Sequence, residues 1–187
     1  VLRNVLGMGT VAYTAVFGLC GATVTVTIAV AASLVRRFSQ ARQVRVGLIA
    51  VLVVDTVFAA VCLTWLREPV AGPERMPLLV AVVALFLAHV ACLGLSMGNA
   101  PALALDRTGR WAGTGSALLG FLQFVVGGLV SPLVGLTGEA SGVAFGVVIV
   151  AVGVIANILA VFGLRERGEK QRLAAQEAER RQRRLGQ

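Results

Sequence analysis

The sequence predicts an all-α integral membrane protein with five transmembrane helices. Of its 187 residues, 57% are hydrophobic and 14% are charged, and the mean hydropathy is +0.86. No charged side chain occurs between Arg3 and Arg36. A soluble domain cannot bury so much apolar surface, and a disordered chain has the opposite bias, so both classes are excluded.

A helix requires about 20 mostly apolar residues to cross ~30 Å of hydrocarbon. The first segment that qualifies contains no charged residue and ends before a basic loop. The second follows that loop and ends at Arg67, where a connection rich in Pro and Gly begins. The basic loop contains four arginines: Arg36, Arg37, Arg42 and Arg45. In full, we expect spans at about 12–34, 46–66, 77–98, 112–134 and 141–164.

Prolines and small residues mark the later spans. Pro101 and Pro132 each indicate a kink or a helix end, because proline lacks the amide donor and clashes with the preceding turn. A short polar connection at 106–110 leads into the fourth span, and a tight turn at 136–139 leads into the fifth. Small residues spaced by four let helices approach closely in lipid. Two such stripes are present: Gly21, Thr25, Ala29 and Ser33 in the first span, and Ala112, Ser116, Gly120 and Gly128 in the fourth, the latter interrupted only at Phe124.

The net charge of +8 is distributed as expected for a membrane protein. Fourteen of the 17 Lys and Arg residues lie at 36–45, 107–110 and 165–184. Excess positive charge marks the cytoplasmic side, so we predict a multi-pass protein of the inner cell membrane with residue 1 outside and the C-terminus cytoplasmic. Residues 165–187 form a basic cytoplasmic tail, either a solvated helix or a site for anionic lipid or a partner. We expect no binding of nucleic acid.

Two ionisable residues fall inside the spans. Asp55 is the sole acid there, and a charge at the centre of a span costs ~2.5–3.5 kcal/mol on insertion scales. It is a candidate proton carrier or anchor for a cationic substrate; the alternative is a structural hydrogen bond to Thr56 or to another helix. His89 is a second candidate, since histidine titrates near neutral pH, although one hydrogen bond within the bundle also explains it. Gln123 and Asn157 are candidates for helix–helix bonds or substrate contact, and Asn99 for a bond to the backbone.

The sequence contains no signature of an enzyme. There is no Gly-Lys-Ser/Thr phosphate loop, no His-Glu-x-x-His motif and no Cys/His cluster. Cys20, Cys62 and Cys92 each lie within an apolar segment without paired spacing, as is typical of small buried hydrophobic residues. We therefore predict no enzymatic activity, no metal and no cofactor.

Several segments carry a family resemblance. The most specific is Gly109-Arg110-Trp111-Ala112-Gly113-Thr114-Gly115-Ser116, which continues through Leu122-Gln123-Phe124 to Ser131-Pro132-Leu133-Val134-Gly135. Together with Val1-Leu2-Arg3-Asn4-Val5-Leu6-Gly7 and Leu34-Val35-Arg36-Arg37-Phe38-Ser39, it resembles the Bcr/CflA-type multidrug efflux transporters of the major facilitator superfamily. The resemblance covers nearly the whole chain.

The resemblance implies that the five spans are helices 8–12 of a twelve-helix fold and that residues 1–164 are part of its C-terminal half. Seven further N-terminal helices are then expected, in agreement with the odd number of spans and the outside position of residue 1. It implies export of drugs or other amphipathic small molecules, driven by proton entry through alternating access.

The resemblance also implies roles for particular residues. Helices 8, 10 and 11 flank the central cavity, which favours His89 and Gln123 as substrate contacts, with Phe86, Phe121 and Phe124 as aromatic candidates. Asp55 falls on helix 9, which usually packs outside the cavity, so the resemblance favours it less for proton coupling. The basic loop would anchor the cytoplasmic face. Two alternatives remain open: a truncated membrane module that does not transport, and an exporter of sugars or metabolites with the same fold.

Overall fold

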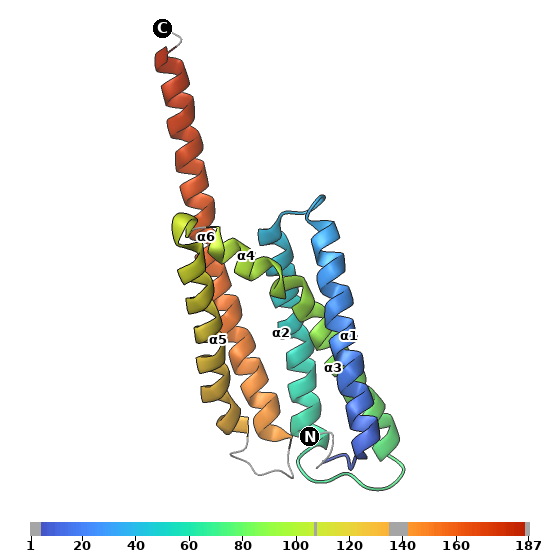
Figure 1. The fold of residues 1–187 in the computed structure, drawn as a ribbon. Coiled ribbons are helices and arrows are strands. Elements are labelled where there is room, and N and C mark those ends of the chain that lie inside the picture. The colour runs from blue at the N-terminus through green and yellow to red at the C-terminus, as the bar shows by residue number, and fades with distance from the viewer. Residues whose placement is uncertain (1–4, 107, 135–141, 186–187) are drawn as a thin grey trace.

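The computed structural model describes residues 5–106, 108–134 and 142–185, with side chains as far as Arg165. The described residues form helices only, which confirms the predicted all-α class (Figure 1). The elements are α1 (Thr10–Leu34), α2 (Gln40–Trp65), α3 (Arg75–Met97), α4 (Asn99–Leu105), the 3₁₀ turn η1 (Gly109–Trp111), α5 (Ala112–Val134) and α6 (Val143–Leu185).

Five helical segments are long and apolar enough to cross a membrane, which matches the number expected from the sequence. The second begins at Gln40 rather than near 46, because Ser39 caps α2 by accepting a hydrogen bond from the Arg42 amide at 3.3 Å. The third breaks at Gly98 and resumes as α4, which contains Pro101. The fifth continues without a break through the basic tail to Leu185. The expected turn at 136–139 and Arg107 lie outside the described residues.

The helices form a row in the order α5, α6, α2, α3, α1 (Figure 1). The second helix, α2, is central because it packs against both α3 and α6 and carries more buried residues than any other described helix. The short helix α4 contacts α2, α3 and α5 at one end of the bundle, along the direction of the helix axes. At the opposite end, the segment before α1 closes the bundle, since Val70 donates to the carbonyl of Val5 at 3.0 Å and Arg75 to that of Leu6 at 2.8 Å.

Glycines mark the closest helix crossings, although not the glycines that the four-residue spacing favoured. A Cβ at Gly47 would lie 2.5 Å from a side chain of α3, one at Gly94 2.7 Å from a side chain of α1, and one at Gly146 2.9 Å from a side chain of α2. By contrast, nothing lies within 4 Å of a Cβ built at Gly21 or Gly120. The predicted stripe on α5 faces away from the described helices, because α5 packs along the edge of the row and buries none of its residues.

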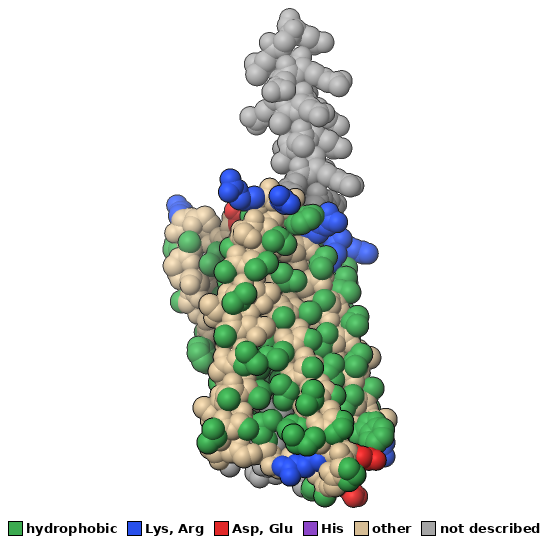
Figure 2. Space-filling model, turned by 90° about the vertical axis from the view of Figure 1, so that its right-hand side faces the viewer, with side chains coloured by type: hydrophobic (Ala, Val, Ile, Leu, Met, Phe, Trp, Pro, Cys, Tyr) green, Lys and Arg blue, Asp and Glu red, His purple; other side chains and the backbone are tan. Residues whose placement is uncertain are grey.

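The surface has the character of a membrane protein. Large apolar side chains such as Val53, Leu129 and Phe124 are 59%, 70% and 85% exposed. Figure 2 shows apolar side chains over the length of the bundle on one face, with charged groups gathered at its two ends. So extensive an exposed apolar surface requires lipid rather than water. The chain is therefore a multi-pass α-helical membrane protein.

Candidate functional site

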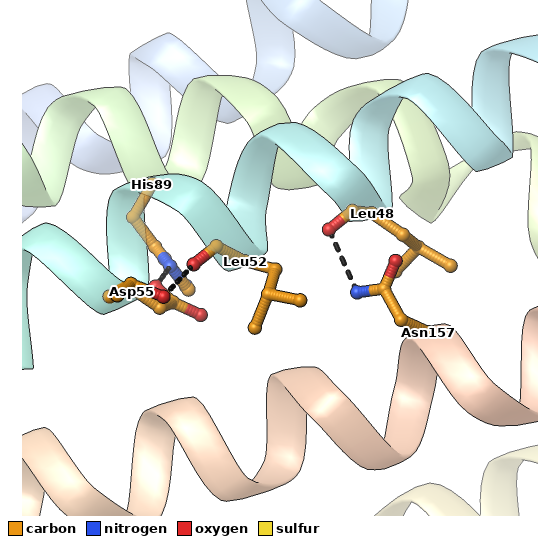
Figure 3. Close-up of polar contacts among 6 residues, drawn as sticks. Leu48, Leu52, Asp55, His89 and Asn157 are labelled. Atoms are coloured by element: carbon orange, nitrogen blue, oxygen red, sulfur yellow. Dashed lines mark hydrogen bonds and ion pairs between the residues drawn. The ribbon is translucent and has the colours of Figure 1, made fainter.

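The two ionisable residues of the spans, Asp55 on α2 and His89 on α3, meet inside the bundle. Nδ1 of His89 lies 2.6 Å from Oδ1 of Asp55, within hydrogen-bond and ion-pair distance (Figure 3). Asp55 is only 2% exposed and the His89 side chain 20%. The sequence assigned these residues separate roles, but the structure joins them in one pair between neighbouring helices.

The pair lies in a dry, crowded environment. The surrounding hollow encloses only about 10 Å³ and is lined by Phe58, Leu85, Phe86, Phe145 and Ile149 in addition to the pair. The second carboxylate oxygen, Oδ2, faces α6, where a Cβ at Gly153 would lie 3.3 Å from it. Three helices therefore converge on one carboxylate. A buried charge in such a place requires a partner, and His89 is that partner.

Chemically, the pair combines two groups that can each bind a proton, a carboxyl and an imidazole. They share one hydrogen bond between Nδ1 and Oδ1, in which the tautomer of His89 decides the donor. The alternative partner, Thr56, does not pair with Asp55, because its hydroxyl donates to the Leu52 carbonyl at 2.7 Å. Protonation of the pair changes the charge at the junction of α2, α3 and α6.

Asn157 connects α6 to α2 near the pair. Its Nδ2 donates to the carbonyl of Leu48 at 3.0 Å (Figure 3). It also donates to the carbonyl of Gly153 at 2.9 Å. This placement corresponds to the helix–helix role expected for Asn157. It also fixes the register of α6 beside Gly153, the glycine that leaves room for the Asp55 carboxylate.

Aromatic rings separate the pair from a larger apolar hollow. Phe86 packs edge-on against Phe58, with ring centroids 5.3 Å apart, and stacks on Phe145 at 5.7 Å. Phe86 and Phe145 contribute to both hollows. The larger hollow has a volume of about 270 Å³ and is lined by Tyr13, Val16, Phe17, Cys20, Phe86, Val90 and Phe145.

The structure brings together only part of the predicted substrate set. Phe86 and His89 lie in adjacent hollows on α3. Gln123, Phe121 and Phe124 are exposed on α5, which α6 and α2 separate from α3 in the row. These three do not line the aromatic hollow.

A second buried polar cluster was not predicted from the sequence. Gln43, Ser96 and Asn99 are each at most 5% exposed. Asn99 donates to Gln43 Oε1 at 3.1 Å and to the Leu95 carbonyl at 2.9 Å, and Ser96 donates to the Val44 carbonyl at 3.3 Å. The backbone bond expected for Asn99 is present. The role of Gln43 was not predicted because the expected span began after it. The one sequence signal that the helix starts earlier is Ser39, a typical N-cap residue.

The arginines of the basic loop are exposed at the end of the bundle near this cluster. The guanidinium of Arg42 lies over the ring of Phe38, 5.2 Å from its centroid. Among the residues searched in the described part of the chain, no three His, Cys, Asp or Glu residues are placed to hold a metal ion.

Part of the chain is similar to a known protein. Over 88 residues the chain is 38% identical to the protein named "Uncharacterized MFS-type transporter YdgK" of Bacillus subtilis (strain 168). The match covers 47% of this chain and 21% of the relative, so the aligned part is about a fifth of that protein. No family model and no solved structure matches the chain.

Proposed function

We propose that the chain is part of a proton-coupled exporter of drugs or other amphipathic small molecules, of the Bcr/CflA type within the major facilitator superfamily. Its five spans would be helices 8–12 of that transporter. The protein would cross the inner cell membrane and have its C-terminus in the cytoplasm. Seven further helices complete the transporter. The similarity to an MFS-type transporter more than twice as long as this chain supports the superfamily and the larger assembly.

The observation that carries proton coupling is the buried Asp55–His89 pair. A carboxylate that is 2% exposed in a membrane helix is costly to maintain, and such residues mark proton and ion pathways in transporters. The pair holds a proton where three helices meet. Gain or loss of that proton alters the attraction between α2 and α3, the kind of change that biases a bundle between two arrangements.

Substrate binding would use apolar and aromatic surface. Phe86 lines the 270 Å³ hollow beside the pair and supplies such a surface within the described chain. Gln123, Phe121 and Phe124 on α5 lie exposed and would contact substrate where further helices complete the cavity. A change in the protonation of the pair would act through His89 on the neighbouring wall that Phe86 forms.

The test is drug uptake into inside-out membrane vesicles from cells that express the complete transporter of which this chain would be a part. An imposed pH gradient, acidic inside, should drive accumulation of a fluorescent amphipathic drug, and a protonophore should abolish it. Asp55→Asn should lower proton-driven uptake at least about tenfold at equal membrane content, whereas the neighbouring Thr56→Val should not change it. Equal uptake by Asp55→Asn and wild type would contradict the role of the pair.

A drug panel tests the substrate side. Gln123→Leu should change the drug profile without abolishing expression, and an unchanged profile would remove Gln123 from the site. Uptake of sugars or metabolites in place of drugs would favour the exporter of different specificity. Absence of uptake by correctly inserted protein would favour the module that does not transport.

A further inference from the structure

A second hollow lies at the end of the bundle that carries the basic loop. Its volume is about 240 Å³, and it lies where α1 ends and α2 begins. Among the residues that the structure describes, Arg42 is the only charged one in its wall. The described lining is Leu34, Phe38, Arg42, Gln43, Val46 and Leu95.

The hollow carries positive charge that no described carboxylate pairs with. Arg36, Arg37, Arg42 and Arg45 are all exposed, and none of them forms an ion pair with a carboxylate among the described side chains. The other polar residue of the wall, Gln43, is 5% exposed, and its side-chain amide is already bonded to Asn99 and to backbone groups between residues 31 and 38. Arg42 is therefore the wall group available to an anionic ligand.

Below the arginine, α2 presents a continuous apolar stripe. Val46, Ile49 and Val53 follow Arg42 at intervals of three and four residues, so they share its face of the helix. These three side chains are 52%, 52% and 59% exposed. From Arg42 to Val53 the helix rises about 16 Å, close to half the ~30 Å hydrocarbon thickness of a bilayer. A cation at one end of an apolar stripe of this length matches one leaflet of lipid.

We propose that this hollow binds an anionic phospholipid, an inference that does not depend on the transport activity. The phosphate of the headgroup pairs with Arg42, and an acyl chain lies along Val46, Ile49 and Val53. The apolar wall favours a lipid over a free phosphate ion, because it offers contacts only to a hydrocarbon chain. The net charge of the loop favours an anionic lipid over a zwitterionic one, whose own amine would meet the other arginines.

The test is retention of phosphatidylglycerol by the purified protein. Protein taken from vesicles of equal parts phosphatidylglycerol and phosphatidylcholine is examined by native mass spectrometry, which counts bound lipids by type. We expect preferential retention of phosphatidylglycerol and a loss of about fivefold in Arg42→Gln, the factor typical of one basic residue beside an anionic membrane. Size-exclusion elution and circular dichroism establish that each variant is folded.

A matched control is available in Arg110. Its guanidinium lies 5.3 Å from the ring centroid of Trp111, much as Arg42 lies over Phe38, but it does not line the hollow. Arg110→Gln should retain phosphatidylglycerol as wild type does. For the apolar half, Val46→Ser should reduce retention, whereas Val126→Ser, at a position 53% exposed on α5, should not.

Three results would overturn the proposal. Equal losses in Arg42→Gln and Arg110→Gln would mean diffuse attraction to a basic surface. Equal retention of the two lipids by wild type would mean that no headgroup is recognised. Displacement of the lipid by millimolar glycerol phosphate, with no effect of Val46→Ser, would mean a site for a soluble anion.

Discussion

Replacing His89 with leucine removes the partner of a carboxylate that is 2% exposed. When both groups are charged, the attraction at the observed 2.6 Å is roughly 6 kcal/mol in an effective dielectric of about 20. Removing both ions from water offsets much of this gain, so the intact pair contributes little net stability. The single variant keeps the desolvation cost of Asp55 and loses the attraction. We therefore expect His89→Leu to lower the free energy of unfolding by about 3–5 kcal/mol.

The size of this loss in unfolding free energy distinguishes an ion pair from a neutral hydrogen bond, because loss of the latter costs only about 1 kcal/mol. It also predicts the behaviour of the double variant. Asp55→Leu combined with His89→Leu leaves no buried charge and fills the site with side chains of similar volume. The double variant should be within about 1 kcal/mol of wild type, or more stable.

The assay is thermal unfolding of the detergent-solubilised protein, followed by the loss of its monodisperse elution peak. With about 2–4 °C per kcal/mol for a chain of this size, His89→Leu should unfold roughly 6–20 °C below wild type. Thr56→Val is the control, because it removes a hydroxyl from the same turn of α2 without touching the pair. The reasoning fails if His89→Leu unfolds within about 2 °C of wild type, or if the double variant is no more stable than the single one.

Three further predictions use the same assay. Gly146→Ala should lose about 1–3 kcal/mol, because the added Cβ would lie 2.9 Å from a side chain of α2, whereas Gly127→Ala, with nothing within 4 Å, should lose nothing; equal effects would contradict the α2–α6 crossing. Phe58→Ala should cost about 3–5 kcal/mol at a position 3% exposed, and Phe124→Ala, 85% exposed, close to none; a cost at Phe124 of the same size would indicate a packing partner on α5. Asn99→Leu should cost about 1–3 kcal/mol through its lost buried hydrogen bonds, and an unchanged stability would show that water replaces them.

Hydropathy alone predicted the helices because lipid leaves the backbone no other way to satisfy its hydrogen bonds. The end of α1 at Leu34 and that of α5 at Val134 coincide with the predicted limits. The helix α2 begins six residues before the expected span, because Gln43 and its basic neighbours lower the local hydropathy although they suit a helix end near water. A polar residue at a span terminus is therefore better placed by its cap than by its hydropathy.

The pairing of Asp55 with His89 was not predictable from the sequence. The residues are 34 positions apart on different helices, and helical periodicity assigns a side chain to a face without saying which helix covers it. The same limit explains the small-residue stripes. Spacing by four identified smooth faces containing Gly21 and Gly120, but the close crossings of the described bundle occur at isolated glycines such as Gly47 and Gly146.

The unbroken course of α6 makes the C-terminal segment a lever arm. Because α6 runs from Val143 to Leu185, the part beyond Arg165 extends the axis of the fifth span by about 30 Å. A tilt of α6 by about 10° would then displace its far end by roughly 5 Å at that helical rise. Small motions of the membrane helix would thus become larger displacements near Leu185. A fluorophore attached there would make these displacements measurable by energy transfer.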